Sequence, residues 1–135
     1  MKGIRWIVLV MALIALSGCS DNEGADKENS EEPNLQIIEV KVETDPTTIE
    51  VGKDTEIKAI VTQGDELVSD ANEVQFEIWK EGAADDDHFK KEASLQDEGE
   101  YVINYSFEEK GKYFIIAHTT ARDMHNMPKV EIQVQ

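Results

Sequence analysis

Six short segments rich in β-branched and aromatic residues, most of them with alternating apolar and polar positions, constrain the fold of this chain more than any other feature. Successive side chains of a strand point to opposite faces of a sheet, so a period of two predicts strands that are buried on one side. The segments are residues 35–43, 56–62, 73–80, 99–107, 112–119 and 129–134. Turns rich in Gly, Asp and Asn separate them, and no helical period of useful length appears. About 100 residues with this rhythm predict an immunoglobulin-like antiparallel β-sandwich of about seven strands.

Two of these segments predict how the strands are buried. Residues 73–80 alternate strictly, which places Val74, Phe76 and Ile78 on one face. Residues 112–119 are apolar on both faces, as expected for a central strand. A core built from such residues is large enough for the region to be stable alone.

The N-terminus has the pattern of a bacterial lipoprotein. A short basic start is followed by an apolar run over residues 6–16, which is shorter than the about 20 residues that a transmembrane helix needs. Residues 16–19 read Leu-Ser-Gly-Cys and fit the lipobox, in which the cysteine carries lipid chains such as palmitate and begins the mature protein. We expect residues 1–18 to be a signal peptide. Cys19 would anchor the protein to the cell membrane, facing outside the cytoplasm. The alternative is an ordinary signal peptide with an incidental cysteine.

A charged segment follows the expected anchor. Residues 20–34 contain no large apolar side chain, so we expect residues 19–34 to form the lipidated cysteine and an acidic, disordered tether. Residues 35–135 would form the single folded domain.

The charge and the cysteine content exclude several classes of function. Without Lys2 and Arg5 of the signal peptide, 11 basic and 29 acidic residues leave a net charge of −18. Non-specific nucleic-acid binding requires a basic surface, so we expect no nucleic-acid partner. Because Cys19 is the only cysteine, the folded region has no disulfide, no thiolate metal site and no cysteine nucleophile.

Soft metal ligands gather near the end of the chain. Residues 118–127 contain two of the three histidines and both methionines of the mature part: His118, Met124, His125 and Met127. Imidazole with thioether suits copper, above all Cu(I), whereas Zn(II), Mg(II) and Ca(II) prefer other ligands. The alternative is that the methionines fill gaps in the core and the histidines are ordinary loop residues.

The spacing predicts which of these side chains share a face. Pro128 restricts Met127 to an extended conformation, so His125 and Met127 would project from one side, with Cα atoms about 6.5 Å apart. We expect residues 120–127 to connect the last two strands. Met124 would point to the other side of a straight strand, so it would join the site only if this connection turns near His125.

His88 and Trp79 lie outside this cluster. His88 follows three aspartates, and we interpret this segment as a solvated loop. The alternatives are an additional site of oxygen and nitrogen ligands for Cu(II), or a distal ligand of the cluster. The aspartates lack the pattern of a calcium-binding loop. We expect Trp79 to be a core or half-buried aromatic residue.

The cluster also carries a resemblance to a known family. Residues 111–128, GKYFIIAHTTARDMHNMP, resemble the closing signature of the YtkA-like domain, which is related to the FixH group. The similarity continues through residues 76–79 and 99–101 and covers most of residues 36–135. It implies a small extracytoplasmic β-sandwich, often a lipoprotein, with links to copper handling and cytochrome oxidase maturation. It places the copper ligands on four residues: His118, Met124, His125 and Met127. Periplasmic copper chaperones of similar fold spread their ligands more widely, and their early Met has no counterpart here.

Two hypotheses of function follow. The first is a membrane-anchored, extracytoplasmic copper-binding protein, a monomer that carries Cu(I) to a membrane protein or assists oxidase maturation. The second is a metal-free interaction module that assists a membrane complex. The second predicts buried methionines, with His118 and His125 pointing apart by more than about 10 Å. No catalytic arrangement is present in the sequence, so we do not expect an enzyme.

Overall fold

The computed structural model describes residues 36–135. The expected signal peptide, residues 1–18, and the expected lipidated tether, residues 19–34, therefore lie outside the described residues. Within the described part, no helix is long and apolar enough to cross a membrane. Leu35–Gln135 form one compact unit, and every residue of its hydrophobic core comes from that unit. We therefore expect residues 30–135 to fold by themselves.

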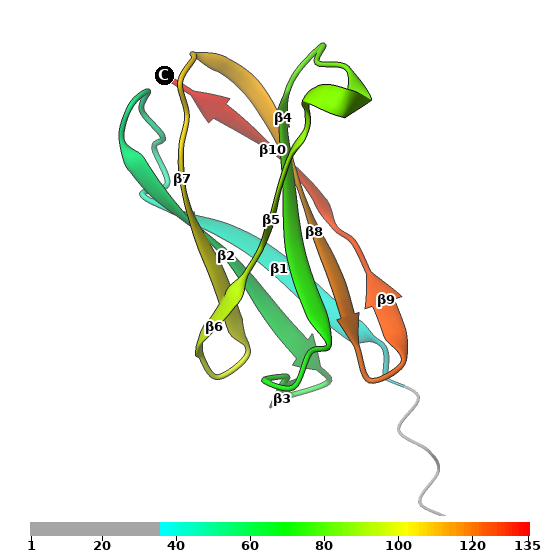
Figure 1. Ribbon diagram of the computed structural model, residues 1–135. Coiled ribbons are helices and arrows are strands. Elements are labelled where there is room, and N and C mark those ends of the chain that lie inside the picture. Colours follow the sequence, from blue (N-terminus) through cyan, green and yellow to red (C-terminus); the bar gives the residue numbers. More distant parts are fainter. Residues whose placement is uncertain (1–35) are drawn as a thin grey trace, which may run out of the picture. The chain divides into compact units, whose positions relative to one another are not determined.

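The described residues form two antiparallel sheets packed face to face (Figure 1). The first sheet has the order β1-β2-β7-β6, with β3 beside β2, and contains β1 (Ile38–Asp45), β2 (Asp54–Gln63), β3 (Glu66–Leu67), β6 (Ser94–Asp97) and β7 (Glu100–Ser106). The second has the order β10-β8-β4-β5, with β9 beside β8, and contains β4 (Glu73–Lys80), β5 (Phe89–Glu92), β8 (Gly111–Ala121), β9 (Met124–Asn126) and β10 (Lys129–Val134). A single 3-10 turn, Asp85–Asp87, precedes β5. The predicted immunoglobulin-like antiparallel sandwich is confirmed.

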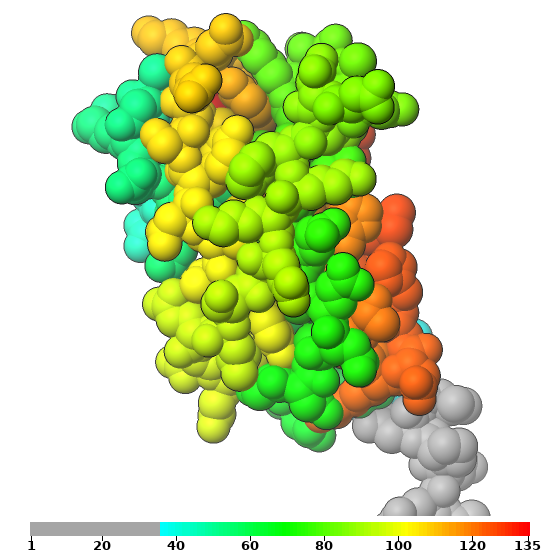
Figure 2. All heavy atoms as spheres, in the orientation of Figure 1, coloured from blue at the N-terminus to red at the C-terminus, as the bar shows by residue number. Residues whose placement is uncertain are grey.

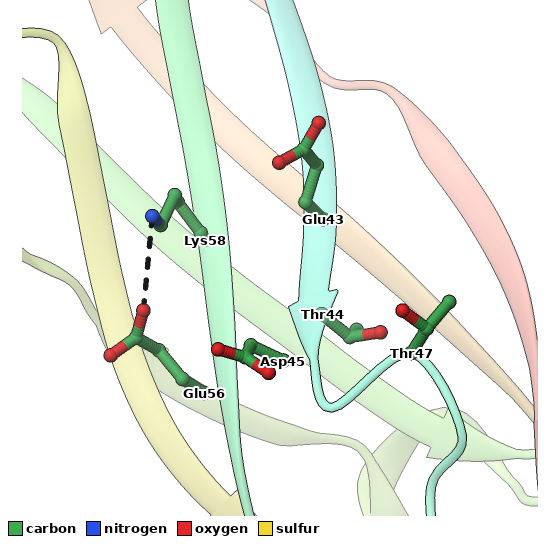
Figure 3. A pocket seen from close by; sticks show the side chains of 6 residues that line it. All are labelled: Glu43, Thr44, Asp45, Thr47, Glu56 and Lys58. Carbon is green, nitrogen blue, oxygen red and sulfur yellow. Dashed lines mark ion pairs between the residues drawn. The ribbon is translucent and has the colours of Figure 1, made fainter.

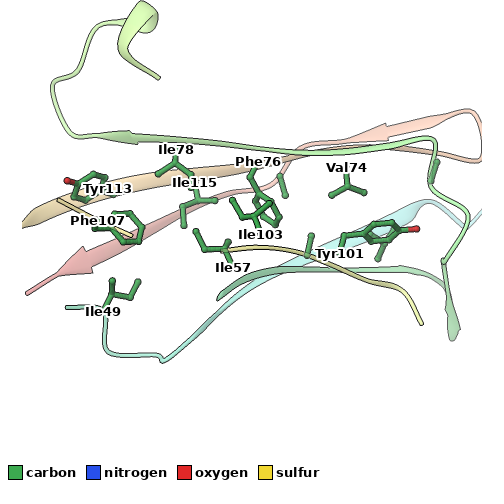
Figure 4. Close-up of a cluster of buried hydrophobic side chains, with 14 of the residues drawn as sticks. Ile49, Ile57, Val74, Phe76, Ile78, Tyr101, Ile103, Phe107, Tyr113 and Ile115 are labelled. Carbon is green, nitrogen blue, oxygen red and sulfur yellow. The ribbon is translucent and has the colours of Figure 1, made fainter. Parts of the chain in front are cut away.

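The core lies between the two sheets. Phe76 and Ile78 of β4 face Ile57 and Ile103 of the first sheet, as Figure 4 shows. Phe76 and Ile57 are fully buried. Burying a side chain of this size contributes about 1.5–3 kcal/mol, so the alternating pattern of β4 is a main source of stability.

β8 positions the candidate ligands. It is the longest strand and lies between β10 and β4, which confirms the predicted central strand. Its odd-numbered positions from Tyr113 to Ala121 are buried between the sheets. Its even-numbered positions, including His118, lie half-buried on the outward face of the second sheet. The sequence is apolar on both faces because neighbouring side chains cover the outward face as well.

The end of β8 differs from the expected loop. Residues 120–121 continue the strand, and β9 returns beside it after a two-residue turn at Arg122 and Asp123. Both turn residues have positive φ, 52° and 60°, as in the tight turn that joins twisted antiparallel strands. Arg122 donates to Gln63 Oε1 at 2.7 Å and to Glu66 Oε1 at 2.6 Å, which ties the turn to β2 and β3.

One side of the sandwich is closed by short strands. β5 is an edge of the second sheet and β6 is an edge of the first, and the chain passes directly from one to the other. Figure 2 shows this segment, in yellow-green, lying over that side of the molecule between β4 and β7. All residues of both strands are exposed, so their sequence carries no burial pattern that could have predicted them.

Candidate metal centre

Strand pairing brings His118 and Met127 together. β9 and β10 both pair with β8 in one continuous register, and in that register His118 lies opposite Met127. Between the two strands the ladder continues with a hydrogen bond from Ala117 N–H to the Pro128 carbonyl, 3.2 Å long. Facing residues of an antiparallel pair place their side chains on the same side of the sheet. Met127 is 52% exposed, so its thioether is accessible from solvent.

His125 lies on the same outward face. It pairs with Thr120, whose Oγ1 lies 2.9 Å from Nδ1 of the imidazole. The ring centroids of His125 and His118 are 6.4 Å apart. Two imidazoles that bind one ion at about 2.0 Å have centroids at most about 6.3 Å apart, and closer when a third ligand bends the angle at the metal, so these two rings would have to approach each other slightly to share an ion. The separation is well below the distance of more than about 10 Å that the metal-free hypothesis predicts.

Met124 is on the other side of the strand. It pairs with the buried Ala121 and packs, half-buried, against the hydrophobic core. The structure therefore brings His118, His125 and Met127 together but not Met124, because the side chains of a strand alternate. The metal-free hypothesis expects both methionines to be buried packing residues, whereas Met124 packs half-buried against the core and Met127 is 52% exposed.

Glu77, which the sequence did not indicate, connects two histidines. It lies on the outward face of β4, next to β8. Its Oε2 accepts a hydrogen bond from Nε2 of His118 and its Oε1 accepts one from Nδ1 of His88, each 2.6 Å long. Hydrogen bonding from His88, followed by that from His118, holds the pKa of Glu77 below its ordinary value, although partial burial opposes this. Glu77 is therefore a carboxylate at neutral pH.

His88 is part of this network and not a solvated residue. Its side chain is only 10% exposed, so the interpretation as a solvated loop holds for the exposed Asp85–Asp87 but is wrong for His88. Its ring stacks on the indole of Trp79, with centroids 4.3 Å apart and planes inclined by 9°. Trp79 is half-buried on the outward face, and its ring lies 5.5 Å from that of Phe114. Lys129 Nζ lies 5.1 Å and 4.3 Å from these two ring centroids, within the range of cation–π attraction.

The donors of the candidate centre are two imidazoles and one thioether. Among residues 36–135, no three side chains of His, Cys, Asp or Glu are arranged to hold a metal ion. A site for zinc, calcium or magnesium built from such groups is thus not present in this part of the chain. His118, His125 and Met127 would offer a different donor set, of two imidazole nitrogens and one thioether sulfur.

A groove adjoins the candidate centre. It is lined by Ile37, Ile38, Met124, His125 and Asn126. Asn126 donates from Nδ2 to the carbonyl of Ile38 at 2.8 Å, which fastens β9 to the start of β1. The hairpin that carries His125 is therefore held at one end by this contact and at the other by Arg122.

A second hollow lies on the first sheet, away from the candidate ligands. Figure 3 shows its lining, which is Glu43, Thr44, Asp45, Thr47, Glu56 and Lys58. Lys58 forms ion pairs with Glu56 at 3.9 Å and with Glu100 at 3.0 Å. The acidic groups of this hollow are therefore partly neutralised by Lys58. None of the predicted metal ligands lines the hollow.

Comparison with solved structures supports the fold alone. An engineered protein superposes with a TM-score of 0.53 at 11% sequence identity. The match covers 74% of this chain but only 20% of the length of that protein. Superoxide reductase (neelaredoxin) from Ignicoccus hospitalis gives a TM-score of 0.48 at 9% identity, covering 74% of this chain and 81% of its own. The PKD domain of an M14-like peptidase from a Thermoplasmatales archaeon gives 0.43 at 16% identity, covering 73% and 92%. No curated protein matches the sequence significantly.

The sequence comparison identifies the family. The pattern that defines the YtkA-like family matches residues 32–118. The match includes His88 and His118 and ends before Met124, His125 and Met127. It covers well over half of the chain, from before β1 to within β8, and this protein therefore belongs to the YtkA-like family.

Proposed function

We propose that this protein binds Cu(I) through His118, His125 and Met127 outside the cytoplasm. The observation that carries the proposal is the position of two imidazoles and a thioether on one outward face, with ring centroids 6.4 Å apart. Copper is favoured over other metals because a neutral thioether is a poor ligand for hard ions, while each added thioether favours Cu(I). Met124 is not part of the proposed ligand set, because it packs against the core.

Each imidazole offers one nitrogen to the ion. Nε2 of His118 donates to Glu77, so its Nδ1 is the nitrogen with a free lone pair. In the proposed site Nδ1–H of His125 donates to Oγ1 of Thr120, which leaves the lone pair of its Nε2 for the ion. Metal-binding histidines commonly use one nitrogen for the ion and the other for an oriented hydrogen bond.

The exposure of the ligands suits a carrier. Met127 is 52% exposed, so an acceptor protein can approach the sulfur directly. The lipobox at residues 16–19 favours attachment to the membrane through Cys19, facing outside the cytoplasm. The proposed acceptor is a membrane-bound protein, such as an oxidase under assembly. The net charge of −18 for the mature chain would steer a monomeric carrier to a basic docking surface.

A copper titration of residues 30–135 under reducing conditions tests the proposal. A chromophoric Cu(I) chelator serves as the competitor. We expect one Cu(I) per chain, and we expect the His125→Ala and Met127→Ala double variant to bind at least about tenfold more weakly. Met124→Leu is the matched control, because it keeps volume in the core and should bind as the unaltered domain does. Unchanged affinity in the double variant would show that the proposed ligands are wrong.

The alternative function is a metal-free interaction module, favoured by the packing of Met124 against the core. It predicts that the unaltered domain binds no Cu(I) at the proposed ligands. It also predicts that the His118→Ala and His125→Ala variants still associate with the same membrane complex, which co-purification from membranes measures.

A further inference from the structure

We propose that Glu77 is a positioning residue of the candidate copper site, which fixes His118 so that Nδ1 of its imidazole faces the ion. This inference rests on the proposed function and adds a residue that does not touch the ion. It is carried by the two hydrogen bonds of 2.6 Å that the carboxylate accepts from His118 and His88.

The chemistry of the carboxylate determines where the protons are. A glutamate carboxyl group has an ordinary pKa of about 4.3, so it is ionised at neutral pH and can only accept hydrogen bonds. Nε2 of His118 and Nδ1 of His88 must therefore each carry hydrogen. A neutral imidazole has one N–H, so Nδ1 of His118 keeps its lone pair for a metal ion.

Glu77 is itself held in place. Its side chain is 13% exposed, and its second oxygen is occupied by His88. The ring of His88 cannot turn freely, because it stacks on Trp79 at 4.3 Å. Lys90 Nζ approaches the same carboxylate oxygen at 3.8 Å. In the described part of the chain, no other carboxylate accepts hydrogen bonds from two imidazoles.

A held carboxylate of this kind affects a metal site in two ways. It keeps the histidine in one tautomer and orientation, and it makes the metal-binding nitrogen a stronger donor. Loss of such a partner typically costs about 10- to 100-fold in metal affinity. Glu77 would therefore contribute to copper affinity through its hydrogen bond with His118, although it does not contact the ion itself.

The test compares Glu77→Leu with Glu73→Leu in residues 30–135. Glu73 lies on the same strand and the same outward face, opposite Thr120, and it has no ion pair among the described residues. Each variant removes one negative charge, so the long-range effect of charge on the cation is matched. We expect Glu77→Leu to weaken Cu(I) binding by about 10- to 100-fold. Glu73→Leu should change it by less than about twofold, because an exposed charge is screened.

Nitrogen-15 NMR of the metal-free domain gives a second readout. We expect His118 in the pure Nε2–H form and His88 in the Nδ1–H form, which is the less populated form of a free imidazole in water. In Glu77→Leu both rings should show a mixture of forms, with His88 shifted towards Nε2–H. A His118 ring with its hydrogen on Nδ1 in the unaltered domain would overturn the inference, as would undiminished copper affinity in Glu77→Leu.

Glu77→Gln covers the case in which leucine disturbs folding. Its amide places an NH2 donor where the carboxylate has its second oxygen, so one of the two imidazoles loses its acceptor; copper affinity should again fall and one ring should change form. Equal affinity and unchanged rings in this variant overturn the role of Glu77. Absence of Cu(I) binding by the unaltered domain would contradict the proposed function. The tautomers of His118 and His88 in the metal-free domain would still show whether Glu77 holds both rings.

Discussion

His118, His125, Met127 and Glu77 lie on one outward face of the second sheet, and Met124 lies on the other side of its strand. Alternation and Pro128 placed His125 and Met127 on one side and Met124 on the other, and the described strands have this arrangement. Glu77 could not be found in the same way. Its contact with His118 depends on β4 lying beside β8, and the residues between them in sequence do not specify that pairing. The role of His88 could not be found from the sequence either, because its contact with Glu77 also depends on how the strands pair.

The two methionines should respond differently to substitution. Met124→Ala removes a side chain that packs against the core, so we expect the free energy of unfolding to fall by about 1–3 kcal/mol, while Cu(I) affinity stays the same. Met127→Leu removes an exposed sulfur, so affinity should fall with little change in stability. Urea unfolding and Cu(I) competition measure the two effects. Loss of copper affinity in Met124→Ala at full folding would place Met124 among the ligands.

His88 should act on copper only through Glu77. His88→Phe keeps a ring to stack on Trp79 but removes the N–H that holds the carboxylate. We expect Cu(I) affinity to fall by about two- to tenfold, less than in Glu77→Leu, because His118 keeps its own hydrogen bond. The chelator competition used for Glu77 measures this. An effect larger than that of Glu77→Leu would indicate that His88 binds the ion directly.

At the scale of elements, strand length decides what could be predicted. The six longer strands, β1, β2, β4, β7, β8 and β10, were all expected from the sequence, five of them from alternation and β8 from its apolar faces. The missed strands β3, β5, β6 and β9 have two to four residues. So short a segment cannot display a period of two. The turn before β9 also gave no signal, because Arg122 and Asp123 replace the usual Asn-Gly of such hairpins.

The hairpin turn should tolerate glycine better than alanine. Asp123 has φ of 60° and makes no hydrogen bond or ion pair with another described residue. Asp123→Gly should raise the free energy of unfolding by about 0.5–1 kcal/mol, because glycine adopts this conformation without strain. Asp123→Ala is the matched control and should be less stable than Asp123→Gly. Thermal unfolding compares them. Equal stability of the two variants would mean that the turn relaxes when the side chain changes.

For the whole molecule, the two packed sheets would hold the three proposed ligands on the outward face of the second sheet. The three proposed ligands come from β8, β9 and the residue that follows β9, so no flexible loop has to close around the ion. The fold class was predictable because the core pattern repeats along the whole domain. The position of the centre on the second sheet was not, because it depends on the order β10-β8-β4.

Membrane attachment is the prediction at this scale that the sequence makes most directly. Cys19→Ser should prevent lipidation, so the protein should move from the membrane fraction to the soluble extracytoplasmic fraction. The Cu(I) affinity should not change, because the proposed ligands lie in the folded domain. Fractionation of cells with an antibody against the domain measures this. Retention of the Cys19→Ser variant in the membrane fraction would show that another feature anchors the protein.

X-ray absorption spectroscopy of residues 30–135 loaded with one equivalent of Cu(I) identifies the atoms bound to the ion. We expect copper bound by two imidazole nitrogens and one sulfur, and loss of the sulfur in Met127→Leu. Met124→Leu should leave the spectrum unchanged. Copper without sulfur in its coordination shell, or a domain that leaves Cu(I) with the chelator, would contradict the account.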